Sequence, residues 1–349
     1  RLPRAFRVFG GGFSRDGRSV VLRNYIIKRV VISVFILFFV TLIIYGLVRA
    51  MPTSYVESMA IRLSQAPGSK PYDEWLAQLN AAYGLDQPFL VGWFTWAKEF
   101  CTGNFGDSWR FTMPVAQKFK EVIGVSFVMA AVSMFFELII AIPLGIVAAT
   151  KQYSRADYTI SATALIGLSL PTFFFASLLK LAFAVKLGWF DTHGLVGRNF
   201  AQLSASGQFW DMAHHLVLPI ITLVIIQVGS LMRYTRTNML EVLNADYIRT
   251  ARAKGLSEGR VVYHHAFRNT LIPLVTIIGG SLPGLFSGAL ITETLFSIPG
   301  IGYTSYQAMV GGDIPFTMFY LTFIAILTLA GNLISDILYA VVDPRVRLS

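Results

Sequence analysis

Long apolar segments alternate with polar ones along the whole chain. A membrane-crossing helix needs about 20 mostly apolar residues, because the hydrocarbon core of a bilayer is ~30 Å thick and a helix rises ~1.5 Å per residue. Six segments reach or approach this length: Val30–Val48, Val122–Ala149, Thr159–Leu187, Leu216–Met232, Leu271–Thr292 and Phe316–Val342. The pattern therefore predicts an all-α membrane protein with six transmembrane helices.

The distribution of charge predicts the orientation of these helices. Residues 1–29 carry eight Lys and Arg against one acidic residue, and residues 233–270 carry seven against three. On the alternate side, segments 188–215 and 293–315 are net acidic and segment 49–121 is balanced. Because loops rich in Lys and Arg stay in the cytoplasm, both termini and the 233–270 loop are predicted to be cytoplasmic. The net charge of +10 is then explained by topology, and we expect membrane lipid but no nucleic acid as a partner.

The loops between the predicted helices divide the chain into four parts. These are a basic cytoplasmic N-terminal extension (1–24), the first transmembrane helix (25–49), an extracytoplasmic subdomain (50–121), and a core (122–349) with the other five helices and the cytoplasmic loop 233–270. Within the subdomain, amphipathic stretches at 72–83 and 88–100 predict two short helices. The sequence Tyr83-Gly84-Leu85-Asp86-Gln87-Pro88 between them is typical of a helix end, a turn and a new helix start.

Composition and motifs argue against an enzyme. The chain is 54% hydrophobic and only 14% charged, whereas a soluble domain carries about 25% charged residues. It has one cysteine, Cys101, and lacks the phosphate-binding loop, the H-E-x-x-H zinc motif and the G-x-S-x-G nucleophile turn. The pairs His214–His215 and His264–His265 are adjacent in sequence, and helix neighbours point about 100° apart. We therefore expect no catalytic residue and no metal site.

One short polar segment within the 233–270 loop has the pattern of a docking helix. Asn244 is a suitable N-cap and Gly255 a suitable helix end, which predicts a helix of about ten residues that is too short and too polar to enter lipid. Its slim apolar face contains Ile248 and Ala251, surrounded by basic side chains. Such a helix is suited to insertion into a groove on a soluble partner, and a solvated loop helix is the alternative.

The same segment carries a family resemblance. Thr250-Ala251-Arg252-Ala253-Lys254-Gly255, followed by His265-Ala266-Phe267-Arg268-Asn269-Thr270-Leu271-Ile272-Pro273, resembles the inner-loop signature of binding-protein-dependent ABC importer permeases, in particular the dipeptide/oligopeptide branch. The superfamily signature begins Glu-Ala-Ala, and this chain shares the peptide branch's departure from it. Further fragments that resemble this branch, in order, are Tyr83–Pro88, Gly103–Ser108, His215–Pro219, Glu293–Gly302 and Asp343–Arg345. Only residues 1–24 lie outside the resemblance, which fits the first-permease type best.

The resemblance implies a permease subunit that forms half of a translocation pathway in a bacterial or archaeal inner membrane. The implied partners are a second homologous permease, two ATP-binding subunits and an external solute-binding protein. ATP and Mg²⁺ are expected on the ATP-binding subunits and no cofactor on this chain. Peptides are the implied substrate, with oligosaccharides, nickel chelates or another solute as alternatives. A self-contained channel or ion-coupled transporter would need paired intramembrane charges and inverted repeats, which the sequence does not show.

The resemblance also implies a coupling helix at residues 245–256, which would receive movement from the ATP-binding subunits. Gly255 would allow a sharp exit from it, and the basic side chains would meet the groove. The residues assigned to it are Ala245, Tyr247, Ile248, Arg249, Ala251, Arg252, Lys254, Gly255 and Leu256.

Glycines in the fifth predicted helix indicate a pathway or gate. Gly280, Gly284 and Gly288 recur every four residues, so they would form one smooth strip. The strip would pack on the partner permease or a neighbouring gate helix, or within this chain. Pro283 permits a bend there. The following segment, 293–303, is too irregular to span and is expected to cap the pathway at the outer interface.

Polar residues inside the predicted helices are further candidates. Glu137 lies near the middle of the second helix; an internal hydrogen-bond network is the favoured interpretation, and contact with peptide amines the alternative. Lys180 is expected to snorkel toward the outer interface, with a peptide carboxylate as the alternative partner. Asn332 and Asp336 share a face of the sixth helix and are expected to pack at the gate.

Overall fold

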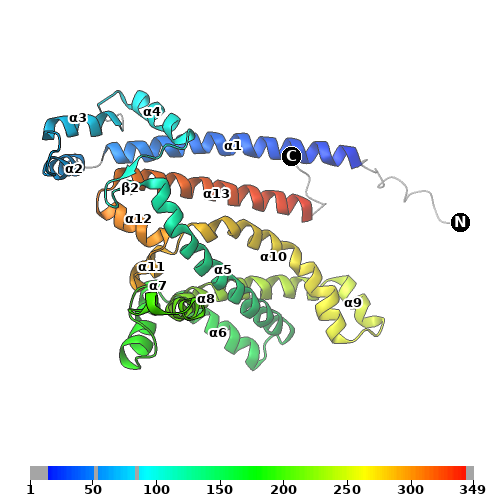
Figure 1. Cartoon of the computed structure of the whole chain (residues 1–349). Helices are drawn as coiled ribbons and strands as arrows, with labels where there is room; N and C mark the ends of the chain where they lie inside the picture. Colours follow the sequence, from blue (N-terminus) through cyan, green and yellow to red (C-terminus); the bar gives the residue numbers. More distant parts are fainter. Residues whose placement is uncertain (1–14, 51–53, 83–85, 343–349) are drawn as a thin grey trace.

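The computed structural model describes residues 15–50, 54–82 and 86–342, and these are mostly helical (Figure 1). The long helices are α1 (Arg15–Arg49), α5 (Val115–Thr150), α8 (Ala205–Leu243) and α13 (Ile314–Val342). The shorter elements are α2 (Ser54–Ser64), α3 (Tyr72–Ala82), α4 (Phe89–Cys101), β1 (Asp107–Ser108), β2 (Met113–Pro114), α6 (Arg155–Ser169), α7 (Thr172–Leu179), η2 (Lys180–Lys186), η3 (Phe200–Gln202), α9 (Asp246–Ala253), η4 (Arg260–Phe267), α10 (Arg268–Ser281), η5 (Leu282–Phe286), α11 (Leu290–Phe296) and α12 (Ile301–Val310). The short helices α2–α4 lie at one end of the bundle and α9 at the other, and these are called the α2–α4 end and the α9 end.

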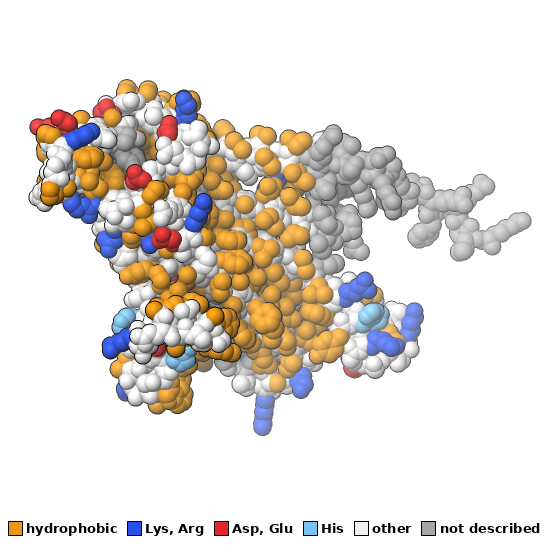
Figure 2. Space-filling view, viewed as in Figure 1, with side chains coloured by type: hydrophobic (Ala, Val, Ile, Leu, Met, Phe, Trp, Pro, Cys, Tyr) orange, Lys and Arg blue, Asp and Glu red, His pale blue; other side chains and the backbone are white. Residues whose placement is uncertain are grey.

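Within the described part of the chain, four helices are long and apolar enough to cross a membrane: Asn24–Arg49, Val115–Thr150, Ala205–Leu243 and Ile314–Leu338. Two bent pairs raise that number to as many as six if each pair crosses once. The helical fold predicted from the apolar segments is thus confirmed, with four to six candidate spans. Figure 2 shows hydrophobic side chains covering the middle of the molecule, with most charged side chains at its two ends.

Two of the predicted transmembrane helices are not continuous. The segment Thr159–Leu187 is broken into α6 and α7, which bend by 102° at Leu170 and Pro171, because proline lacks the backbone N–H and disfavours helix in the preceding residue. The segment Leu271–Thr292 divides among α10, η5 and α11, and a bend of 48° lies near its start, between Arg260–Leu271 and Pro273–Phe286. Apolar length alone did not reveal either break.

The closest helix pair in the centre of the bundle is α5 with α8. A Cβ atom on Gly145 of α5 would lie 2.6 Å from Cβ of Thr235 and 2.8 Å from the carbonyl oxygen of Met232, both on α8. Only glycine fits such a distance, and small residues are the usual means of close helix approach in membranes. The apolar side chains of Ile146 and Met239 pack beside this contact.

The subdomain at the α2–α4 end rests on the ends of α1 and α13. One buried apolar cluster joins them. It contains Tyr45 and Val48 of α1, Ala60 of α2, Trp109 of the segment between β1 and β2, and Met318 of α13. The two helices predicted at 72–83 and 88–100 are confirmed as α3 and α4, whereas α2 was not predicted. Pro88 precedes α4 as expected; positions 83–85 of the predicted turn lie outside the described residues.

Glu293 joins three elements at the α2–α4 end. It is fully buried on α11, and its Oε1 accepts hydrogen bonds from Oγ of Ser126 on α5 at 2.7 Å and from the N–H of Ala289 at 2.9 Å. Its Oε2 accepts from the N–H of Tyr303 on α12 at 2.9 Å. Ser126 Oγ in turn accepts from the N–H of Ile301 at 2.8 Å. The irregular segment 293–303 is therefore two short helices tied to α5 by a buried carboxylate.

We expect Glu293→Ala to destabilise the chain by about 3 kcal/mol, because removing a buried acceptor leaves several donors without partners. The measurement is the melting temperature of the purified protein in detergent. Glu74→Gln, a change at an exposed carboxylate of α3, is the control and should leave it unchanged. An equal melting temperature for Glu293→Ala and the control would contradict the role given to Glu293.

Candidate functional site

The helix predicted in the 233–270 loop is α9, and its start differs from the prediction. Asn244 ends α8, where its Nδ2 donates to the carbonyl oxygen of Leu240 at 2.9 Å, and Ala245 occupies the N-cap position of α9. The helix contains eight residues rather than about ten. The predicted N-cap at Asn244 is therefore wrong, because α8 extends to Leu243 and Asn244 caps its end. The sequence does not show that α8 extends so far.

The apolar face of α9 packs against its own chain. Ile248 is fully buried and Ala251 nearly so. They share a cluster with Ile146 of α5, Met239 of α8 and Val261 of η4. Ile248 and Ala251 are therefore covered by the chain itself, and the insertion of α9 into a groove on a soluble partner stays a prediction that would have to involve its other face. Burial of apolar side chains stabilises a helix, and the chain itself provides the covering surface.

The opposite face of α9 is polar and exposed. The side chain of Arg249 is 72% exposed and that of Asp246 98% exposed, with 3.5 Å between NH1 and Oδ1. Tyr247 exposes 48% of its surface; burial of the rest, and to a smaller extent the charge of Glu241, raises the pKa of its phenol. These residues, with Thr250 and Lys254, are what a partner at this end would contact.

The remaining assigned residues at the α9 end have local roles. Arg252 donates to both carboxylate oxygens of Glu258, at 2.9 and 3.4 Å, so part of the basic rim is neutralised within the chain. Leu256 is half-buried beside the apolar face. Gly255 has a φ of +74° and its N–H donates to the carbonyl oxygen of Arg252 at 2.9 Å. The sharp exit predicted at Gly255 is confirmed, because this left-handed backbone favours glycine.

An ion pair that the sequence analysis missed fixes α6 to α8 at the same end. Arg236 donates from Nε and NH2 to the two carboxylate oxygens of Asp157, both at 2.8 Å. Asp157 is buried and also accepts from the N–H of Tyr153 at 3.0 Å. Bidentate Arg–carboxylate pairs are geometrically specific. No spacing in the sequence relates the two residues, because they lie on different helices.

Glu137 lines a cavity of about 290 Å³ in the middle of the bundle. The cavity is partly open and is lined by residues of α5, α8, α10 and η5, and its polar lining includes Gln227, Ser281 and Glu137, with Gly284 beside them. No hydrogen bond or ion pair joins Glu137 to another residue in the part of the chain that the structure describes. The internal network expected for Glu137 is therefore not found. Two pathway candidates, Glu137 and Gly284, are brought together here.

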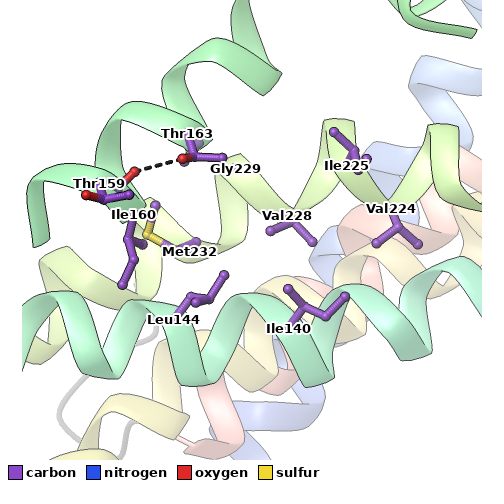
Figure 3. Close-up of a pocket in the computed structure, with 11 residues that line it drawn as sticks. Ile140, Leu144, Thr159, Ile160, Thr163, Val224, Ile225, Val228, Gly229 and Met232 are labelled. Atoms are coloured by element: carbon purple, nitrogen blue, oxygen red, sulfur yellow. Dashed lines mark hydrogen bonds between the residues drawn. The ribbon is translucent and has the colours of Figure 1, made fainter. Parts of the chain in front are cut away.

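A second hollow, of about 360 Å³, has a different character (Figure 3). It lies between α5, α6 and α8, and its lining is almost wholly aliphatic. Thr159 and Thr163 are its polar side chains, and Thr163 Oγ1 donates to the carbonyl oxygen of Thr159 at 2.8 Å. The hydroxyl of Thr163 is bonded to its own helix, so this hollow offers few hydrogen-bonding groups to a polar solute. The Glu137 cavity is the better pathway candidate.

The expected glycine strip does not form. Gly288 has a φ of +79° and lies in a turn between η5 and α11, off the helix that carries Gly280. A Cβ on Gly280 would lie 3.0 Å from Cβ of Ser335 on α13, so Gly280 serves packing within this chain. Pro283 is the second residue of the 3₁₀ helix η5, which directly follows α10, and a single helical face does not connect the three glycines.

The other polar candidates bind neighbouring elements. Nζ of Lys180 donates to the carbonyl oxygen of Leu295 at 2.8 Å, in the last turn of α11, where carbonyls lack helical partners, and the snorkelling of Lys180 toward the outer interface stays a prediction. Asp336 lies 3.2 Å from NH1 of Arg29 on α1. Asn332 is exposed. Neither a gate nor an ion site is formed by Asn332 and Asp336 in this chain alone.

The left-handed backbone at Gly255 gives a direct test. Gly255→Ala should destabilise the exit from α9 by about 1 kcal/mol, because φ of +74° is unfavourable for a side chain although no atom lies within 4 Å of the added Cβ. Faster hydrogen exchange of the α9 amides is the expected readout. Gly259, with a φ of −58° and equally open surroundings, supplies the control Gly259→Ala. Equal exchange in both variants would argue against a strained exit.

Comparison with known proteins adds the family. The family described as "Binding-protein-dependent transport system inner membrane component" matches residues 141–348. The oligopeptide transport system permease protein AppB of Bacillus subtilis is 37% identical over 93% of this chain and 99% of AppB. The dipeptide transport system permease protein DppB of Alkalihalophilus pseudofirmus is 32% identical over 93% of this chain and 99% of DppB.

One solved structure has a similar fold. It is the inward-facing MetNI methionine ABC transporter, with a TM-score of 0.50, 18% identity, and coverage of 65% of this chain and 97% of that chain. The family consists of membrane permeases, and ATP hydrolysis belongs to partner subunits. Because the family match covers more than half of the chain, this multi-pass protein belongs to the family of inner membrane components of binding-protein-dependent transport systems.

Proposed function

We propose that the chain is the first permease of an ATP-driven importer for peptides. The observation that carries this is its similarity, over nearly the whole length of both proteins, to permeases of oligopeptide and dipeptide transport systems. In this proposal it forms half of the pathway with a second homologous permease. Two ATP-binding subunits, which hold ATP and Mg²⁺, attach at the α9 end, and a solute-binding protein delivers peptide to the α2–α4 end.

The arrangement of the helices supports a topology of six crossings with both termini cytoplasmic. The beginning of α1, the helix α9 and the end of α13 all lie at one end of the bundle (Figure 1). An even number of crossings must therefore separate α9 from the beginning of α1 and from the end of α13. Three of the long helices precede α9 and one follows it, so each of these intervals needs one further crossing. The two bent pairs then each cross once. In this topology residues 50–121 form the extracytoplasmic subdomain, and residues 122–349 the permease core with the cytoplasmic loop 233–270.

We propose that α9 is the coupling helix and that it acts through its polar face. Tyr247 and Arg249 are exposed, and these residue types dominate the energy of many protein interfaces. Ile248 fixes the other face to α5 and α8. A displacement of α9 by a partner would thus be passed to the two central helices as a rigid movement.

We further propose that the Glu137 cavity is part of the pathway. A carboxylate at membrane depth without a partner among the described residues is costly and is a functional candidate by default. The ammonium group of a peptide would supply the missing partner during passage. Lining residues on α5, α8 and α10 place the cavity between the helices that α9 is attached to.

The docking proposal is tested by Tyr247→Ala/Arg249→Ala in the complete complex in proteoliposomes. Truncation of two interface anchors of about 2 kcal/mol each should lower peptide-stimulated ATPase activity and peptide uptake at least about tenfold. Lys151→Ala/Tyr153→Ala is the matched control, since both residues are exposed on the turn between α5 and α6. Loss of coupling in the control but not in the α9 variant would place docking elsewhere.

The pathway proposal is tested by Glu137→Gln, which keeps the size of the side chain and removes its charge. We expect uptake of peptides with a free amino terminus to fall about tenfold, the equivalent of about 1.4 kcal/mol, with the amount of assembled complex unchanged. Glu241→Gln, at an exposed position of α8, is the control. Unchanged uptake in Glu137→Gln would remove Glu137 from the pathway.

A further inference from the structure

Three potential metal ligands meet beside the beginning of α8. Asp191, His214 and His215 each offer one ligand atom, and these atoms lie within 4.8 Å of one another. The two histidines are on α8, and Asp191 is on the loop between η2 and η3. Helix geometry alone separates the rings of adjacent histidines, so no shared ion is expected from the sequence. Asp191 is a third group, from a separate loop, and the sequence does not show that it lies close to both rings.

The hydrogen bonds of His215 leave one ring nitrogen for a cation. Its side chain is only 2% exposed, and its Nδ1 lies 2.8 Å from the carbonyl oxygen of Asp211. A carbonyl oxygen can only accept, so Nδ1 carries the hydrogen and Nε2 of the neutral ring carries a lone pair. A hydrogen bond of this kind, from the ring nitrogen that does not bind the metal, orients most metal-binding histidines.

The free nitrogen faces another acceptor. Nε2 of His215 is 3.2 Å from Oδ2 of Asp191. Two lone pairs at this distance repel each other unless a positive species lies with them. Ligand atoms bound at ~2.0–2.1 Å to a tetrahedral ion are about 3.3 Å apart, which agrees with the observed distance. A proton on Nε2 would also relieve the repulsion, but it would not involve His214.

The loop that carries Asp191 is held in place from several directions. Gly197 donates its N–H to Oδ2 of Asp211 on α8 at 2.8 Å, and Gly194 donates to the carbonyl oxygen of Phe296 on α11 at 2.9 Å. Phe190 stacks on the ring of His214, with 4.8 Å between the centroids. The loop that carries Asp191 is therefore positioned without an ion, and the three ligand atoms, which lie within 4.8 Å of one another, would have to approach to about 3.3 Å around a bound ion.

We propose that Asp191, His214 and His215 bind a divalent transition-metal ion of the Zn²⁺ type. Two imidazoles and one carboxylate suit Zn²⁺ better than Mg²⁺ or Ca²⁺, which prefer oxygen ligands. The fourth position is open to solvent, because the Asp191 side chain is 58% exposed. The ion links the loop before α8 to α8 itself, at the end of the bundle where α11 lies.

The test uses the full chain in detergent, purified without a polyhistidine tag and with Cys101→Ser, because Cys101 is an exposed thiol. Equilibrium binding is measured with Zn²⁺ alone, and with Mg²⁺ alone for comparison. We expect a single saturable Zn²⁺ site, weakened at least about tenfold by Asp191→Asn and by His214→Ala, and no site for Mg²⁺. Co²⁺ should give the visible absorption of a tetrahedral ion in the parent and not in these variants. Both variants alter exposed side chains, so size-exclusion elution should stay unchanged.

The adjacent histidines His264 and His265, at the α9 end of the bundle, provide the matched control. His264→Ala/His265→Ala removes two neighbouring histidines that belong to no cluster of three ligands among the described residues, and it should leave Zn²⁺ binding intact. Zn²⁺ binding that is lost in this control and kept in Asp191→Asn would overturn the proposal. So would a parent protein that binds no more Zn²⁺ than Asp191→Asn, which would make His215 the protonated partner of the carboxylate.

Discussion

The close contact of α5 and α8 positions every candidate site described above. It depends on Gly145, where an added Cβ would meet the backbone and Thr235 of α8. Glu137 lies on the α5 side of the central cavity and Gln227 on the α8 side. Toward one end the same two helices cover Ile248, and toward the other they carry Ser126 and the two histidines. A side chain at position 145 would separate the two helices and disturb all of these places together.

Buried carboxylates show how the bundle treats charge. Glu293, Asp157 and Asp313 are all buried, and each accepts hydrogen bonds from donors on other segments. For Asp313 these include the hydroxyl of Ser108 and the N–H of Phe316, at the start of α13. Burial without such donors would be strongly unfavourable. Glu137 differs from these three carboxylates, since it is only half-buried and faces a cavity and not a donor.

Apolar length predicted the helical membrane fold, because it follows from the bilayer as a solvent. The left-handed exit at Gly255 was predictable as well, since local backbone geometry favours one residue type. What the sequence did not reveal depends on contacts between distant segments. Three examples join residues with no regular spacing in the sequence. These are the bond of Lys180 to Leu295, the pairing of Asp336 with Arg29, and the approach of Asp191 to His215. The burial of Ile248 belongs to the same class, because an amphipathic helix does not state which surface covers it.

The self-covered apolar side of α9 has a consequence for how the protein is made. If the apolar residues of a short helix contacted only another subunit, they would be exposed to water until that subunit bound. Here Ile248 and Ala251 are already enclosed by the chain. When partner subunits are scarce, the newly inserted protein therefore does not expose these two apolar side chains to chaperones, proteases or other copies of itself.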